Sequence, residues 1–159
     1  MESLQKAINT AVFFLNSRMR TCREVYDKLL LKGYDKETAE KAVEELVKVG
    51  YLNDRTYAMA YINDGIKLGA KGIYRIRQEL MRKGISSSII EDAIADCEED
   101  TYTQLKNYIE QRNLCENIHS YKDLEKLKAR LARRGYSLQE IKKCLGEYEF
   151  HFEYDEYQR

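Results

Sequence analysis

The sequence contains no proline and no tryptophan, and only eight of its 159 residues are glycine. Proline breaks helix interiors and glycine weakens them, so their scarcity favours helix nearly throughout the chain. No run of about 18 apolar residues is present, which argues against a membrane-spanning helix. The first residues also lack the cationic and apolar regions of a signal peptide. We therefore expect a cytoplasmic protein.

The four cysteines are scattered, with no CxxC pair and no histidine cluster beside them. Such a distribution is typical of reduced thiols rather than of a disulfide framework or a metal site. The sequence also has no glycine-rich phosphate loop, nucleophile elbow or metal-ligand spacing. We therefore expect neither an enzyme nor a bound metal or cofactor.

Charge of one sign is not in excess, because 27 basic residues balance 27 acidic ones. A neutral chain has no general attraction for nucleic acid. Any basic surface must therefore come from the segregation of charge along the chain.

What the chain does have is a repeated turn sequence: a basic residue, a glycine and an apolar residue. It occurs as Lys32-Gly33-Tyr34, Lys83-Gly84-Ile85 and Arg134-Gly135-Tyr136, with the glycines 51 residues apart both times. A fixed period of this size indicates one supersecondary unit used three times.

The segments around each glycine predict a pair of helices. Apolar residues at spacings of three and four precede each glycine, as in Ile73, Ile76 and Leu80, and indicate one buried helical face. Two residues after each glycine stands a good N-cap: Asp35, Ser86 or Ser137. Ser137 and Glu140 form a capping-box pattern. A second helix should therefore begin at each of these caps.

A further helix is expected before each pair, at about residues 4–16, 54–68 and 101–115. The fold prediction is therefore all-α, with three tandem three-helix repeats and about nine helices in an elongated array whose curvature the sequence leaves open. The predicted repeats span residues 1–53, 54–100 and 101–148, followed by an acidic aromatic tail at 149–159. Stacking would bury the apolar face that each small repeat leaves uncovered.

Two alternatives for the tail follow from its composition. Residues 147–157 mix five acidic with five aromatic side chains. In the simpler interpretation Tyr148 and Phe152, four residues apart, extend the last helix into the core. The alternative is a segment that docks on a partner or on the protein's own basic surface.

A helix–turn–helix of this kind invites comparison with DNA-binding proteins that insert the second helix into the major groove. In the middle repeat, residues 88–100 carry six acidic residues and no basic one. Phosphates would repel such a helix, so the sequence argues against major-groove reading there.

The basic residues gather on the first helix of each pair in the second and third repeats. Residues 67–84 and 122–143 each carry a local charge of +5, and five basic positions recur at the offset of 51. The simpler interpretation of each is a solvated helix exterior. Their recurrence instead predicts a basic ridge that binds phosphate or an acidic protein groove. The predicted ridge residues are Lys71, Arg75, Arg77, Arg82, Lys83, Lys122, Lys126, Lys128, Arg133 and Arg134.

Several motifs follow one another in order along all three repeats. These motifs are Leu15-Asn-Ser-Arg18, Arg23-Glu-Val-Tyr-Asp-Lys-Leu29, Gly50-Tyr-Leu-Asn-Asp-Arg-Thr-Tyr-Ala58, Lys71-Gly-Ile-Tyr-Arg-Ile-Arg-Gln-Glu-Leu-Met-Arg-Lys-Gly-Ile85, and Leu131-Ala-Arg-Arg-Gly-Tyr-Ser137 with Ile141. Together they resemble the motifs of the RecX family of bacterial regulatory proteins. The chain departs from the family pattern at Asp64-Gly65-Ile66, where an arginine is common.

The resemblance implies a non-catalytic monomer that lies along the groove of the RecA–DNA filament. There it would inhibit strand exchange, ATP turnover or filament growth in recombination, DNA repair and the SOS response. Single- or double-stranded DNA is implied as a second, weaker partner. Two alternatives stay open: an autonomous nucleic-acid-binding protein, and a general helical scaffold.

Overall fold

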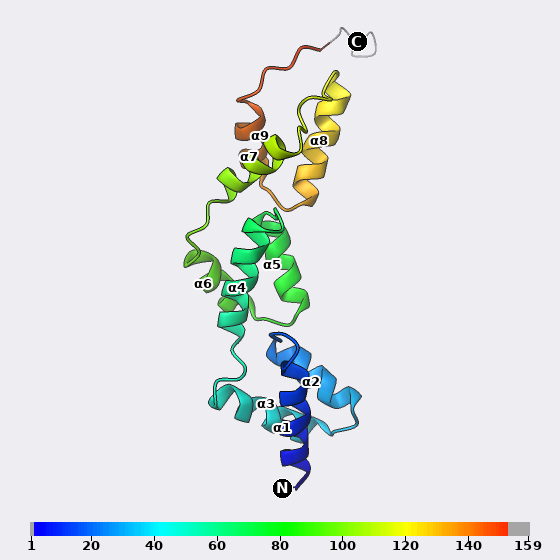
Figure 1. Ribbon diagram of the computed structural model, residues 1–159, viewed down its shortest axis with the longest axis vertical. Helices are drawn as coiled ribbons and strands as arrows, with labels where there is room; N and C mark the ends of the chain where they lie inside the picture. The colour runs from blue at the N-terminus through cyan, green and yellow to red at the C-terminus, as the bar shows by residue number, and fades with distance from the viewer. Residues whose placement is uncertain (1, 153–159) are drawn as a thin grey trace. The chain divides into compact units, whose positions relative to one another are not determined.

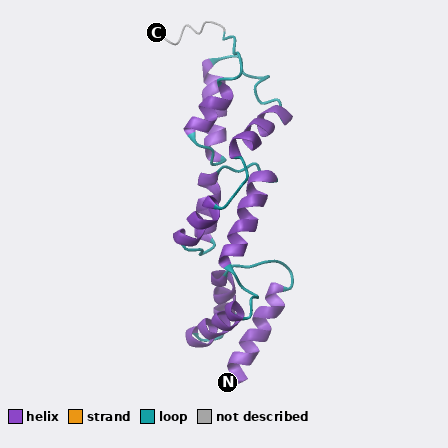
Figure 2. Ribbon diagram, turned by 90° about the vertical axis from the view of Figure 1, so that its left-hand side faces the viewer, coloured by secondary structure: helices purple, strands orange, loops and turns teal. Residues whose placement is uncertain are grey.

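The computed structural model describes residues 2–152, which form nine α-helices (Figure 1). No strand occurs among these residues (Figure 2). The helices are α1 (Glu2–Leu15), α2 (Cys22–Leu31), α3 (Lys36–Lys48), α4 (Asp54–Lys67), α5 (Ile73–Arg82), α6 (Ser87–Ala95), α7 (Thr101–Gln111), α8 (Tyr121–Arg133) and α9 (Leu138–Leu145). The prediction of an all-helical chain of nine helices is confirmed over this range.

The three recurrent glycines end α2, α5 and α8 in the same way. Their φ angles are +98° at Gly33, +86° at Gly84 and +98° at Gly135. After α2, the Gly33 N–H donates to the Leu30 carbonyl and the Tyr34 N–H to the Leu29 carbonyl. The other two turns repeat both bonds. This is the Schellman arrangement, which uses a left-handed residue to satisfy the last carbonyls of a helix.

The predicted N-caps are also confirmed. The side chains of Asp35, Ser86 and Ser137 each accept a hydrogen bond from the backbone N–H three residues later. Ser137 and Glu140 form the complete capping box. A second capping box, between Thr21 and Glu24, begins α2. Local sequence therefore determines where these helices start.

The first and third helix triplets each have a core of their own. In the first, α1, α2 and α3 pack around Val25, Leu29 and Leu46, all of which are buried. In the third, Leu131 and Ile141 lie at the centre of a cluster that α7, α8 and α9 enclose. The expected apolar stripes provide these core residues.

The chain divides into two compact units that do not follow the helix triplets. One unit contains Met1–Tyr61 and Glu79–Cys97, and the other contains Ile62–Gln78 and Glu98–Arg159. The middle triplet is thus shared, with part of α4 and part of α5 in each unit. The predicted boundaries at residues 53, 100 and 148 stay a prediction.

Two details of the third triplet differ from expectation. The helix α7 ends at Gln111 rather than near residue 115, and turns follow it. The prediction that Tyr148 and Phe152 extend the last helix is wrong, because α9 ends at Leu145 with Gly146 as its C-cap. Tyr148 and Phe150 instead pack against the third core without helical structure. The tail beyond residue 152 lies outside the described residues.

Candidate interaction surface

The ten residues of the predicted basic ridge fall into two groups by exposure. Arg82, Lys122, Lys126 and Arg133 are exposed, and the remaining six are partly buried. The ten also belong to both compact units, with Arg82 and Lys83 in the first and the others in the second.

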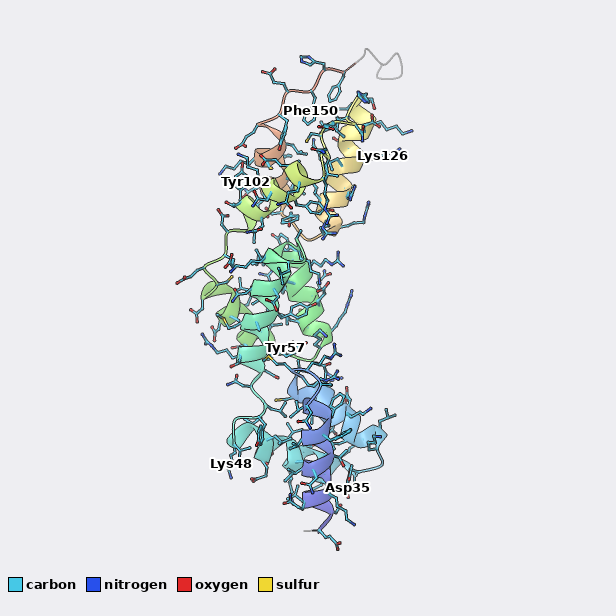
Figure 3. The ribbon with its side chains drawn as sticks, in the orientation of Figure 1. Asp35, Lys48, Tyr57, Tyr102, Lys126 and Phe150 are labelled. Carbon is cyan, nitrogen blue, oxygen red and sulfur yellow. The ribbon has the colours of Figure 1, made fainter. Side chains whose placement is uncertain are left out.

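Within the second unit, α8 presents the clearest basic face. Lys122, Lys126 and Arg133 are all exposed on this helix, and Figure 3 shows Lys126 extending from it. The opposite side of α8 contributes the buried Leu127 and Leu131 to the third core. The helix is thus amphipathic, with cations on the side that its core leaves open.

Arg134, another predicted binding residue, makes contacts within the protein. Its guanidinium donates hydrogen bonds to the carbonyls of Gly69 and Ala70. The guanidinium carbon also lies 4.6 Å from the centroid of the Tyr108 ring. These contacts tie the end of α8 to the segment before α5, so part of the predicted ridge stabilises the fold.

Lys83 holds the equivalent place in the first unit, 51 residues earlier. Its ammonium group lies 6.0 Å from the Tyr57 ring centroid and 5.7 Å from that of Tyr61. These two tyrosine rings stack on one another on α4. Lys83 therefore also packs within the protein.

The four remaining partly buried ridge residues also lie beside other groups of the protein. The turn at Gly135 lies against Arg75, since a Cβ built on Gly135 would come within 2.5 Å of the Arg75 Cβ. Arg77 lies over the Tyr74 ring at 5.6 Å, and Lys128 pairs with Glu125 at 3.2 Å. The Lys71 side chain lies beside Gly65 and Gly69, since a Cβ built on either glycine would come within 4 Å of it. Whether any of the ten binds a partner stays a prediction.

A hydrogen bond to the backbone carbonyl before the turn glycine recurs where one triplet meets the next. In the first unit the Thr21 hydroxyl donates to the Lys83 carbonyl at 2.8 Å. In the second unit the Gly72 N–H donates to the Arg134 carbonyl, also at 2.8 Å. Both donor and acceptor advance by 51 residues between the two junctions. The repeat therefore extends from the helices to the contacts between them.

Sequence reasoning missed this junction and a cavity in the first triplet. The cavity, of about 780 Å³, lies between α1 and α2 and is lined by Phe13, Phe14, Lys28 and Lys32 among others. The Arg20 guanidinium carbon lies 4.0 Å from the Phe14 ring centroid. The two adjacent phenylalanines could have indicated this cavity, because neighbouring residues of one helix cannot both face the same core.

Among residues 2–152, no group of three or more His, Cys, Asp or Glu side chains could hold a metal ion. Over the same range, no helix combines the length and apolar character that crossing a bilayer requires.

Comparison with known proteins gives the family of the chain. Residues 7–46 match the first three-helix domain of RecX, and residues 53–94 match its second three-helix domain. The Regulatory protein RecX of Clostridium beijerinckii is 32% identical over 153 residues, which cover 91% of this chain and 71% of that protein. The chain belongs to the RecX family. Its relatives bear the name of a regulatory protein, not of an enzyme.

Other RecX proteins agree. That of Clostridium perfringens is 34% identical over 83% of this chain and 63% of its own length. The crystal structure of RecX from Lactobacillus salivarius superposes with a TM-score of 0.81 at 26% identity, covering 92% of this chain and 96% of that one. The chain spans between 52% and 71% of the length of eight curated RecX relatives that it matches.

Proposed function

We propose that this RecX protein binds the RecA–DNA filament and restrains recombinase activity, ATP turnover or filament growth. The membership of the family carries the proposal, because the family resemblance implies a regulator of RecA. The physical support is the exposed basic face of α8. A filament presents repeated subunits and phosphates, and several weak contacts from one chain add up through effective concentration.

The residues proposed to contact the filament are the exposed members of the ridge: Arg82, Lys122, Lys126 and Arg133. An exposed cation can approach a phosphate or a carboxylate without losing a contact within its own protein. Lys83 and Arg134, by contrast, already contact tyrosine rings and backbone carbonyls. In this proposal the protein acts in the cytoplasm, as a monomer and without catalysis.

Co-sedimentation with RecA on single-stranded DNA, with ATP turnover followed in parallel, tests the proposal. The wild-type chain should sediment with the filament and lower the rate of ATP hydrolysis. The double variant Lys126→Glu/Arg133→Glu should bind at least about tenfold more weakly, because two attractions become repulsions. A matched control is Lys36→Glu, an exposed lysine on α3. Absence of binding together with unchanged ATP turnover would refute the proposal.

A further inference from the structure

A second basic site lies in the third triplet, where the turn after α7 meets α8. Here a cavity of about 270 Å³ opens between the two elements. Its polar lining residues are Arg112, Asn113, Asn117, Asp123, Lys126 and Arg130. Of these only Lys126 belongs to the predicted ridge. Three cations and two amides thus face one small cavity.

Tyr108 on α7 positions both arginines. An Arg130 guanidinium nitrogen donates to the Tyr108 hydroxyl at 3.2 Å. The Arg112 guanidinium carbon lies 4.5 Å from the centroid of the same ring. Tyr108 itself is only 4% exposed, so the core holds it in place. A buried side chain therefore fixes two guanidinium groups before any ligand arrives, which lowers the entropy lost on binding.

The single carboxylate of the lining is held by groups at the start of α8, and the charge of Lys126 also acts on it. Asp123 accepts a hydrogen bond from the His119 N–H at 3.1 Å. This bond holds the pKa of Asp123 below its ordinary value, with the Ser120 side chain assisting. The carboxylate is thus held at the start of α8, and the cavity keeps a positive balance.

We propose that this cavity binds a phosphate group of a nucleic-acid backbone. Guanidinium groups match the geometry of phosphate oxygens, and asparagine amides add neutral donors. Lys122, Lys126 and Arg130 follow one another at intervals of four residues, about 6 Å apart along one face of α8. Lys126 and Arg130 line the cavity and Lys122 continues the row beyond it, as a strand with a further phosphate would require. This row favours a polymer over a free phosphate ion.

Binding of a labelled oligothymidylate to the full chain, followed by fluorescence anisotropy between about 50 and 200 mM salt, tests the inference. Arg112→Gln/Arg130→Gln should weaken binding about tenfold and lower the logarithmic salt slope by about 0.7, the value for one phosphate on a single strand. Tyr108→Phe keeps the ring but loses the hydroxyl that contacts Arg130. It should weaken binding about threefold.

The controls distinguish binding at this cavity from a general effect of positive charge. Lys48→Gln, on α3 (Figure 3), should leave affinity and salt slope unchanged. If Arg112→Gln/Arg130→Gln binds like Lys48→Gln, or if Tyr108→Phe has no effect, the site is refuted. The same holds if inorganic phosphate perturbs the amide signals of residues 112–130 and the oligothymidylate does not displace it. No recombinase is present in this assay, so its failure leaves the proposed function untouched.

Discussion

Thr21 and Lys83 are 62 residues apart in sequence and are joined by a hydrogen bond of 2.8 Å from the threonine hydroxyl to the lysine carbonyl. Thr21 is fully buried, and its hydroxyl oxygen also accepts the N–H of Glu24 as the cap of α2. One hydroxyl therefore starts a helix and fastens that helix to the next triplet.

Removing this hydroxyl should lower stability more than an ordinary cap mutation does. Thr21→Val loses the cap, at about 1 kcal/mol, and the junction bond, at about another 1 kcal/mol. We expect the free energy of unfolding in urea to fall by about 2 kcal/mol. Thr21→Ser keeps both bonds and should recover most of the loss. A loss of only about 1 kcal/mol for Thr21→Val would show that the junction bond contributes nothing beyond the cap.

The three turn glycines allow a matched comparison. An alanine at any of them pays about 1 kcal/mol for its left-handed backbone. A Cβ on Gly33 meets nothing within 4 Å, whereas one on Gly135 comes within 2.5 Å of the Arg75 backbone nitrogen. Gly135→Ala should therefore destabilise the protein by about 1–3 kcal/mol more than Gly33→Ala.

Gly84→Ala should lie between these two variants, because its Cβ would meet the Arg23 side chain rather than backbone. Urea denaturation of the three variants measures the order directly. Equal losses for all three would mean that the turns at Gly84 and Gly135 are not held against the preceding triplet.

Arg133 and Arg134 are neighbours with different tasks. Arg134→Ala loses two hydrogen bonds to the Gly69 and Ala70 carbonyls and a contact with the Tyr108 ring. We expect a destabilisation of about 2–3 kcal/mol, since charge-assisted bonds are stronger than neutral ones. Arg133→Ala, at an exposed position, should stay within about 0.5 kcal/mol of the wild type. Thermal unfolding followed by circular dichroism distinguishes the two outcomes.

The thiols predict how stability changes at high pH. Burial, with the nearby Asp54 carboxylate assisting, raises the pKa of Cys22 from 9.0 to about 12. Burial likewise raises the pKa of Cys144 to about 11. Above pH 9 the unfolded chain releases these protons while the folded chain retains them, so ionisation favours unfolding. The stability that the neutral thiols provide is complete below pH 9 and is lost as the pH rises through 11 and 12.

We therefore expect the free energy of unfolding to fall between pH 9 and pH 11, and to fall less in the double variant Cys22→Ala/Cys144→Ala once both are compared with their own values at pH 7. Urea denaturation at a series of pH values measures this. Parallel pH profiles for the variant and the wild type would contradict the assignment.

The parts of the fold that sequence reasoning predicted are those that neighbouring residues determine. Gly84 requires a left-handed backbone, and Ser137 with Glu140 forms a capping box, so the ends of these helices can be read locally. The end of α9 was misplaced because the spacing of Tyr148 and Phe152 imitates a helical face. Those side chains follow Gly146, where the helix has already stopped.

The sequence predicts the charge of the candidate site but not the contacts that its side chains make within the protein. The sequence shows that Lys83 and Arg134 are basic and equivalent, but not that a tyrosine ring or a carbonyl lies beside each. The clue at Gly72 was present, since it stands 51 residues after Thr21 and lacks a side chain. A Cβ there would lie 2.2 Å from the Gly135 carbonyl group. The sequence alone does not show that Gly72 lies against Gly135.

The repeated junction also sets an order of events during synthesis. A ribosome adds about 5–20 residues per second, so the partner of Thr21 is made about 3–12 seconds after Thr21 itself. The same interval separates Gly72 from Arg134. During this interval the newest triplet lacks its junction hydrogen bond. The bond can form once the turn of the following triplet has been synthesised. Translation speed therefore sets the lifetime of each open junction, through the 62 residues that separate its two partners.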